Sequence, residues 1–283
     1  MVKILSDSTC YLPRELIEKY GITILPLHIL LGEDDFKDGE NITVDEIYAW
    51  AEKNDKTPKT AAISPEEAMN AISSLLEEGD EVICFSISST MSGTFSVMNL
   101  AADSLEVTDR VYCIDSQNLS TGIGLMVIEA ADMAKDGKSA KEIVEHIEAL
   151  RPLVRSSFVV DTLTYLHRGG RCSGVAAMAG SMLKLHPRIA VENGKMDAGK
   201  KYRGKMNKVI LEYVHDMEAD LKKAKPERVF ITHSGCEQEL LDSIHAYLQE
   251  LNVFDEILTS RAGSVISSHC GPGTLGVLYI AQE

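Results

Sequence analysis

The sequence lacks a long apolar run, closely spaced cysteines and an excess of basic residues, and each absence excludes a class of protein. The longest apolar run, ITILPLHILLG at 22–32, contains Pro26 and His28 and is too short to span a bilayer. The six cysteines form no C-x-x-C pair, so their spacing predicts neither a zinc site nor a redox motif. The net charge of −15 argues against a surface that follows nucleic-acid phosphates.

Internal repeats, low-complexity segments and a secretory signal are absent as well. The first residues, MVKILSDST, become polar too soon for a signal peptide, so we expect a cytoplasmic protein without an integral membrane segment. With 45% apolar and 25% charged residues, the composition is that of an ordinary globular protein. A length of 283 residues favours two domains of roughly 100–150 residues each.

The first half alternates short β-rich runs with capped helical patterns. Runs 2–8, 81–87 and 110–115 are typical of strands, and helices are expected at about 92–105 and 121–136. Three further helices open with a capping box, Thr43 with Glu46, Ser64 with Glu67, and Ser139 with Glu142. This alternation predicts a three-layer α/β/α domain with a mainly parallel sheet over residues 1–152.

The pattern changes after Arg151 and Pro152. Runs 156–163 and 188–196 read as strands, the second turning at Asn193 and Gly194 like a hairpin. A long helix is expected at about 203–223, then a strand at 228–234, a helix at 237–251 and β-rich stretches at 256–267 and 274–281. We therefore predict a second, mixed-sheet α/β domain over residues 153–283.

The stretch SISSTMSGT at 86–94 holds six hydroxyl side chains, between an expected strand and an expected helix. Loops that follow parallel strands form the ligand crevice, and the next helix directs free N–H groups into it. Ser92, Gly93 and Thr94 occupy this place without a lysine or arginine, so a carboxylate fits better than a triphosphate. The alternative is a well-capped helix behind a hydroxyl-rich turn.

Three other segments offer polar groups of the same kind. Thr60 shortly precedes a helix, the first strand ends at Asp7 with two hydroxyl residues after it, and His269 stands beside Gly-Pro-Gly. The three early loops could converge on one crevice, with His269 binding a ligand or handling a proton. Each feature alone could equally be a turn or a structural histidine.

Basic residues concentrate in one segment. Residues 151–210 carry a net charge of +9 and the rest of the chain −24, counted from the sequence. Within the segment, Arg168, Arg171 and Arg203 stand next to glycines, where a guanidinium can reach a phosphate or carboxylate in bidentate geometry. The segment is either a docking surface for an acidic or phosphorylated partner or a solvated basic face.

Two enzyme signatures are incomplete. GKMDAGKK at 194–201 resembles a phosphate-binding P-loop, but Lys201 replaces the magnesium-binding hydroxyl and a hairpin is expected there. Ser92, His269 and Asp7 could form a hydrolase triad, yet threonines take both glycine positions of the nucleophile motif around Ser92. A Ser/His acyl hydrolase therefore remains only an alternative, as does a module that binds another small carboxylate.

Nine segments resemble the DegV family in order and spacing, over residues 5 to about 278. They are DSTCYLP (7–13), PLHI (26–29), KTAAIS (59–64), SSTMSGTF (88–95), IDSQNLSTGIG (114–124), VDTLTYLHRGGR (160–171), HPRIAVENGKM (186–196), RGK (203–205) and HCGPGTLGV (269–277). The resemblance implies a two-domain α/β fold related to the substrate-carrying subunit of dihydroxyacetone kinases.

The resemblance also implies a function: a bacterial protein without catalysis or cofactor of its own, which holds a long-chain fatty acid between its domains and presents the carboxylate to a separate ATP-dependent kinase. The acyl phosphate so formed would feed phospholipid synthesis. Site residues carried over are Thr60, Ser92, Gly93 and His269 for the carboxylate, and Arg171 and Arg203 facing the kinase or the phosphoryl group.

The chain departs from the family pattern at Ala61 and Cys270, where hydroxyl residues are expected. For the acyl chain, residues 174–185 offer small side chains together with Met178 and Met182 at helical spacing. The same spacing is also common in an ordinary apolar core.

Overall fold

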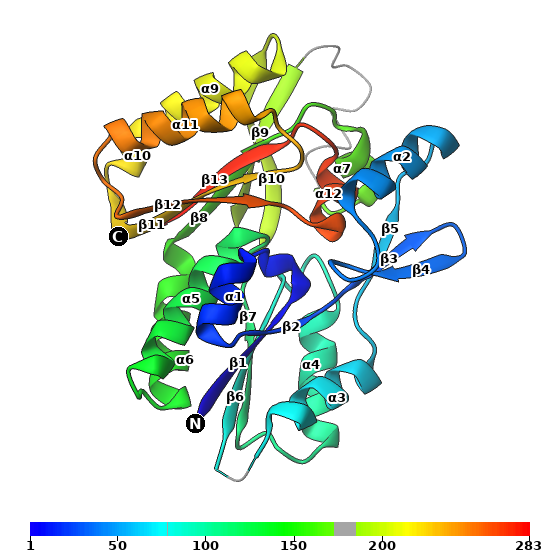
Figure 1. Ribbon diagram of the computed structural model, residues 1–283, viewed down its shortest axis with the longest axis vertical. Helices are drawn as coiled ribbons and strands as arrows, with labels where there is room; N and C mark the ends of the chain where they lie inside the picture. The colour runs from blue at the N-terminus through cyan, green and yellow to red at the C-terminus, as the bar shows by residue number, and fades with distance from the viewer. Residues whose placement is uncertain (78, 173–184) are drawn as a thin grey trace.

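The computed structural model describes residues 1–77, 79–172 and 185–283, and its strands form three sheets (Figure 1). The first is parallel throughout and confirms the predicted sheet of the first half. Its order is β2 (Thr23–Leu25), β1 (Val2–Asp7), β6 (Glu81–Ser86) and β7 (Val111–Asp115).

Helices cover both faces of the parallel sheet, which makes the predicted three layers (Figure 1). One face carries α3 (Pro65–Leu75) and α4 (Thr94–Ser104); the other carries α5 (Thr121–Lys135) and α6 (Ala140–Leu150), with α1 (Arg14–Tyr20) beside α5. The capping boxes of α2 (Val44–Asn54), α3 and α6 form as predicted. The N-cap of α4 is Gly93, and the Oγ of the preceding Ser92 accepts from the Thr94 amide at 3.3 Å.

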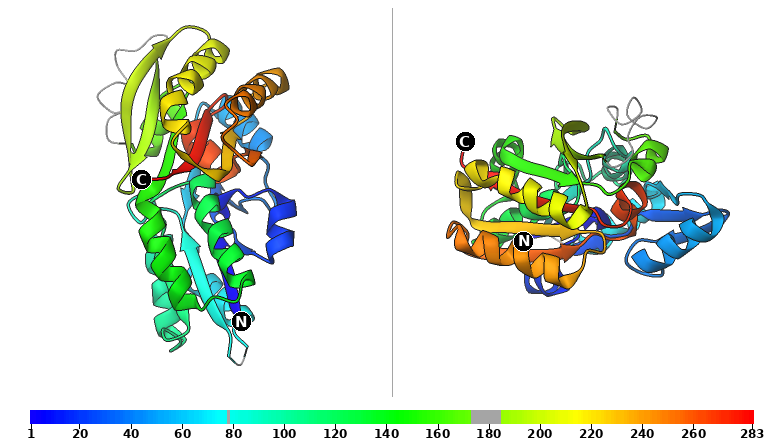
Figure 2. Two further views of the ribbon diagram at one scale, coloured as in Figure 1. Left: turned by 90° about the vertical axis from the view of Figure 1, so that its left-hand side faces the viewer. Right: turned by 90° about the horizontal axis from the view of Figure 1, so that it is seen from above.

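The second large sheet is mixed, as predicted for the second half. Its order is β10 (Lys195–Arg203), β9 (Leu185–Glu192), β8 (Val154–Val159), β13 (Leu275–Ala281), β11 (Ala224–His233) and β12 (Glu256–Arg261). Asn193 and Gly194, both with positive φ, make the expected hairpin turn, so the P-loop-like stretch lies on that turn and β10. Helices α9 (Met206–Asp216) and α11 (Gln238–Glu250) cover the outer face (Figures 1 and 2).

Two expected elements of the second half are wrong. The single helix at 203–223 is instead the end of β10 followed by α9 and α10 (Glu218–Leu221). Helix α9 ends at Asp216, whose carboxylate binds the Tyr202 hydroxyl at 2.8 Å and so ties the helix end to β10. The β-rich stretch at 256–267 gives β12 and then helix α12 (Ser264–Cys270), whose first amide donates to Asp38 at 2.7 Å.

The structure also has a third, small antiparallel sheet that the sequence pattern does not predict. It contains β4 (Asp34–Lys37), β3 (His28–Leu31) and β5 (Lys59–Ala61), and projects to one side together with α2 (Figure 1). Short elements complete the description: η1 (Ser8–Cys10), η2 (Arg151–Leu153) and α7 (Thr164–Gly169), which packs against α12. This small sheet positions Thr60.

One hydrophobic core joins the two large sheets, since Phe85 and Ile123 belong to the same buried cluster as Phe158 and Leu278. A second cluster lies between the mixed sheet and its outer helices. Strands of the parallel sheet all precede residue 152 and those of the mixed sheet all follow it. The domain boundary at that residue nevertheless stays a prediction, because the core does not divide there. Across the described ranges, no helix is long and apolar enough to cross a bilayer.

Candidate functional site

A narrow cavity of about 100 Å³ lies beside the carboxyl end of β6, between β5, α12 and the start of α4. Five of the six site residues expected from the sequence line it: Thr60, Ser92, Gly93, Arg171 and His269. The remaining wall is apolar and consists of Leu27, Ala61, Ala62, Ile87, Met91, Leu119, Met196, Val265, Ile266 and Cys270. The cavity therefore has polar groups on one part of its wall and hydrocarbon on the rest.

Thr60 and His269 meet in this cavity although 209 positions separate them. The Thr60 Oγ1 lies 2.8 Å from the His269 Nε2. The His269 Nδ1 is enclosed and has no hydrogen-bond partner among the described residues. Burial, followed by the charge of Arg171, lowers the pKa of His269 to about 4, so the imidazole is neutral at neutral pH.

Gly169 is a site residue that motif reasoning did not single out. A Cβ at this position would lie 2.4 Å from the His269 Nδ1, so the backbone of α7 packs directly on the imidazole. The Gly169 carbonyl also accepts from the Arg171 Nη1 at 2.7 Å. The available signal was the pair of glycines between two arginines in HRGGR, where a missing side chain allows close approach.

Some side chains of the hydroxyl-rich turn hold neighbouring segments in place, and one of them lines the cavity. Ser88 and Thr90 both donate to the Gly194 carbonyl, the former at 2.7 Å, and so hold the β9–β10 hairpin turn against β6. The Ser89 amide and hydroxyl bind the Asp115 carboxylate. Within the turn, Ser92 is the hydroxyl that lines the cavity, next to the amino-terminal end of α4.

The first loop does not contribute to the cavity, contrary to the expected convergence of three loops. The Asp7 carboxylate accepts from the Thr9 amide at 3.0 Å and from the Ile87 amide at 2.7 Å. Burial raises the pKa of Asp7 to about 6 against the opposing effect of these hydrogen bonds. Asp7 is thus committed to the β1–β6 junction and does not orient His269, so the three residues do not form a triad.

The three arginines singled out in the basic segment lie at different places in the structure. The Arg171 guanidinium lines the cavity, and its Nε donates to the Met91 carbonyl at 3.4 Å. Arg203 ends β10, is exposed, and is not part of the cavity wall. Arg168 lies 3.9 Å from the Asp55 carboxylate. The described residues contain no group of three or more His, Cys, Asp or Glu side chains that could hold a metal.

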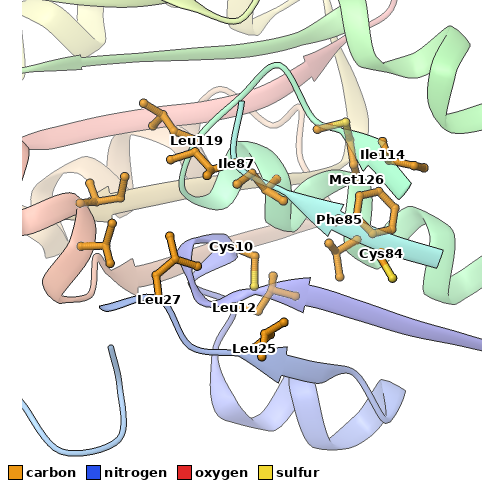
Figure 3. Packing of buried hydrophobic residues seen from close by; sticks show 14 of the residues in the cluster. Cys10, Leu12, Leu25, Leu27, Cys84, Phe85, Ile87, Ile114, Leu119 and Met126 are labelled. Atoms are coloured by element: carbon orange, nitrogen blue, oxygen red, sulfur yellow. The ribbon is translucent and has the colours of Figure 1, made fainter. Parts of the chain in front are cut away.

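A second, smaller cavity of about 30 Å³ adjoins the first, and Leu119, Ile266 and Cys270 line both. Phe158 and Leu278 of the mixed sheet form part of its far wall. Figure 3 shows three apolar residues that line the first cavity, Leu27, Ile87 and Leu119, which come from three different segments. Met178 and Met182, expected to line an acyl tunnel, lie outside the described residues.

Comparison with known proteins gives a family match over nearly the whole chain. The family model described as "Uncharacterised protein, DegV family" matches residues 1–282.

The chain belongs to the DegV family. It is 34% identical over 283 residues to the DegV domain-containing protein CPE1310 of Clostridium perfringens, covering 99% of both chains. Among solved structures it is similar to a DegV-family protein from Thermus thermophilus described by its fatty acid binding, with a TM-score of 0.89, 31% identity and 99% of each chain covered. Another similar structure is a stearic acid-binding protein from Eubacterium ventriosum, with a TM-score of 0.85, 28% identity, and 100% and 99% of the chains covered.

Proposed function

We propose that this DegV protein binds a long-chain fatty acid, with the carboxylate between Thr60, Ser92, Gly93 and His269. The observation that carries the proposal is the Thr60–His269 pair, 2.8 Å apart, at the polar part of an otherwise apolar cavity. The fatty acid binding described for the Thermus and Eubacterium relatives supports it. A catalytic hydrolase is not favoured, since no described carboxylate binds the His269 Nδ1.

The polar groups suit an ionised carboxylate. Two hydroxyls and a neutral imidazole supply hydrogen-bond donors, and the amino-terminal end of α4 adds a positive partial charge. The charge of Arg171 reaches His269 and adds to the effect of burial in lowering its pKa. Ala61 and Cys270 line the cavity where the family pattern has hydroxyls, so the carboxylate would rest on fewer donors here.

The acyl chain would supply most of the affinity. At roughly 0.8 kcal/mol per buried CH₂, fourteen methylenes contribute on the order of 11 kcal/mol before ordering costs. The cavity of about 100 Å³ is smaller than the about 300–1,000 Å³ usual for ligand sites, so side chains must move to admit the chain. Met91 and Met196 in the wall are well suited to such adjustment, because thioether side chains adapt to irregular shapes.

Mass spectrometry of an organic extract tests the proposal. The purified protein is expected to yield near-stoichiometric fatty acid of about C14–C18, which buries the methylenes counted above. Thr60→Val and Ser92→Ala should lower retention, whereas Ser96→Ala, at an exposed position of the same helix α4, should not. An extract without fatty acid, from a protein that also takes up none when it is added, excludes the proposal. A short polar ligand in the extract would favour a different carboxylate.

We further propose that the protein, in the cytoplasm, presents the bound carboxylate to a separate ATP-dependent kinase for acyl phosphate formation. The exposure of Arg203 and the position of Arg171 at the cavity support a role for these residues toward the kinase or the transferred phosphoryl group. Arg171→Ala and Arg203→Ala should keep fatty acid retention and lower acyl phosphate formation. Arg14→Ala, on the remote helix α1, is the matched control. Loss of retention in both arginine variants would instead assign them to fatty acid binding.

A further inference from the structure

A separate hollow of about 400 Å³ lies where β8 begins and β9 ends, and it shares no lining residue with the two cavities above. Its wall holds three arginines, Arg151, Arg155 and Arg188, and a single carboxylate, Glu192. The basic character is local, because the protein as a whole carries a net charge of −15. A hollow of this size with so uneven a charge is suited to a small anion.

The strand register explains how two of the arginines share one surface. Ser157 of β8 pairs with Ala190 of β9, and Val159 pairs with Arg188. Since side chains alternate along a strand, Arg155 and Ser157 lie on the same face as Arg188 and Ala190. Ser157 and Ala190, which stand between the two arginines on this face, have small side chains and line the hollow. The Tyr213 hydroxyl lies 3.0 Å from the Ser157 hydroxyl and takes part of the space on that face.

Arg155 and Arg188 form no close ion pair with a described carboxylate, although the charge of Arg188 adds to the Lys200 hydrogen bond that lowers the pKa of Asp216. Among the described residues no carboxylate lies within 4.0 Å of the Arg155 or Arg188 guanidinium, whereas Arg151 pairs with Glu148 at 3.2 Å. Arg155 donates to the Pro152 carbonyl at 2.6 Å. The Arg188 Nε is enclosed and has no hydrogen-bond partner among the described residues. An enclosed, unpaired guanidinium donor is costly, and such donors are normally satisfied by a protein group, an ordered water or a bound ligand.

We propose that this hollow binds a small phosphate dianion, either free phosphate or a phosphate ester. Arg155 and Arg188 would hold the phosphate, since guanidinium forks match phosphate oxygens in bidentate geometry. The hollow has room beyond a phosphate group, and Gln117 and Glu192 in its wall can hydrogen-bond the hydroxyls of an attached polar group. An ester of sugar-phosphate size therefore fits better than the free ion. This site is independent of the proposed fatty acid site.

Calorimetric titration at low ionic strength tests the proposal with inorganic phosphate, ribose 5-phosphate and unphosphorylated ribose. We expect saturable binding of the two phosphates, tighter for the ester, and none for ribose. Arg155→Gln and Arg188→Gln should each weaken phosphate binding at least tenfold. Arg14→Gln, an exposed arginine of α1 paired with Glu18, should leave it unchanged. Fatty acid retention should be the same in all variants.

The titrations with inorganic phosphate and ribose 5-phosphate distinguish the two possible ligands. Tighter binding of inorganic phosphate would identify the ligand as the free ion, and tighter binding of ribose 5-phosphate would identify it as an ester. No saturation by either probe, or equal affinity in the wild type and both glutamine variants, overturns the proposal. Arg188 packs beside Tyr213, with its guanidinium 6.0 Å from the ring centroid, so its substitution can disturb folding. If Arg188→Gln does not fold, the test rests on Arg155→Gln, because Arg155 is exposed. Arg188→Lys, which keeps the charge, should bind phosphate more tightly than Arg188→Gln.

Discussion

At the scale of single residues, His269 makes the stability of the folded protein depend on pH. Its pKa falls from 6.5 to about 4 on folding, so between these values the unfolded chain binds a proton that the folded protein does not. Stability from this residue is therefore complete above pH 6.5 and is lost as pH falls toward 4. At about 1.4 kcal/mol per pH unit, the loss between pH 6.5 and 5 is on the order of 2 kcal/mol.

Urea unfolding of the wild type and His269→Gln at pH 7.5, 6 and 5 measures this contribution. The wild type should lose more free energy of unfolding than the variant as the pH decreases. The same slope for both proteins would mean that the folded imidazole takes up a proton as readily as the unfolded one.

Gly169 provides a second prediction at this scale. Because a Cβ there would lie 2.4 Å from the His269 Nδ1, Gly169→Ala should displace the imidazole from Thr60. The expected result is a decrease in fatty acid affinity of about tenfold, the equivalent of one lost hydrogen bond. Gly199→Ala is the matched control, since its Cβ meets the nearest atom, the Arg188 carbonyl, at an ordinary 3.8 Å. Equal affinity of Gly169→Ala and the wild type, by fluorescent fatty acid displacement, contradicts this packing role.

At the scale of elements, the capping box of α3 should be measurable. The Ser64 hydroxyl accepts from the Glu67 amide at 3.2 Å, and the Glu67 carboxylate accepts from the Ser64 amide at 2.9 Å. Ser64→Ala should lower the free energy of unfolding by about 1 kcal/mol. Ser73→Ala, at an exposed position later in α3, should change it by less than about 0.5 kcal/mol. Chemical denaturation of both variants makes the comparison.

Elements with strong local signals were predictable, and elements fixed by distant contacts were not. The capped helices α2, α3 and α6 and the strands of the parallel sheet follow from their own residues. Helix α12 has only seven residues, reads as β-rich, and starts where its Ser264 amide meets Asp38 of a distant segment. The hydroxyl-rich turn indicated Ser92, yet only the folded chain shows that Ser88 and Thr90 bind Gly194. The small sheet that contains Thr60 has no recognisable pattern in the sequence.

At the scale of the whole molecule, polar contacts and the shared core join the two large sheets. Thr121 of α5 and Thr232 of β11 lie 2.6 Å apart through their hydroxyls, and Asp38 of the first half accepts from the Ser264 amide of the second half at 2.7 Å. The cavities that would take the acyl chain lie along this seam, with walls from both halves. The chain of a bound fatty acid would therefore add to the interface between the sheets.

This position predicts how fatty acid affects unfolding. A ligand that binds the folded state alone, at a free concentration 100 times its Kd, adds about 2.7 kcal/mol to the free energy of unfolding. Because the core is continuous between the sheets, the delipidated protein should unfold in one urea transition, and added palmitate should move that transition as a whole. Tryptophan fluorescence follows the first half, where Trp50 lies in α2, and amide hydrogen exchange follows β11 and β13 of the second. Two separate transitions, with only one moved by palmitate, would show that the halves unfold independently and that the acyl chain is held by one of them.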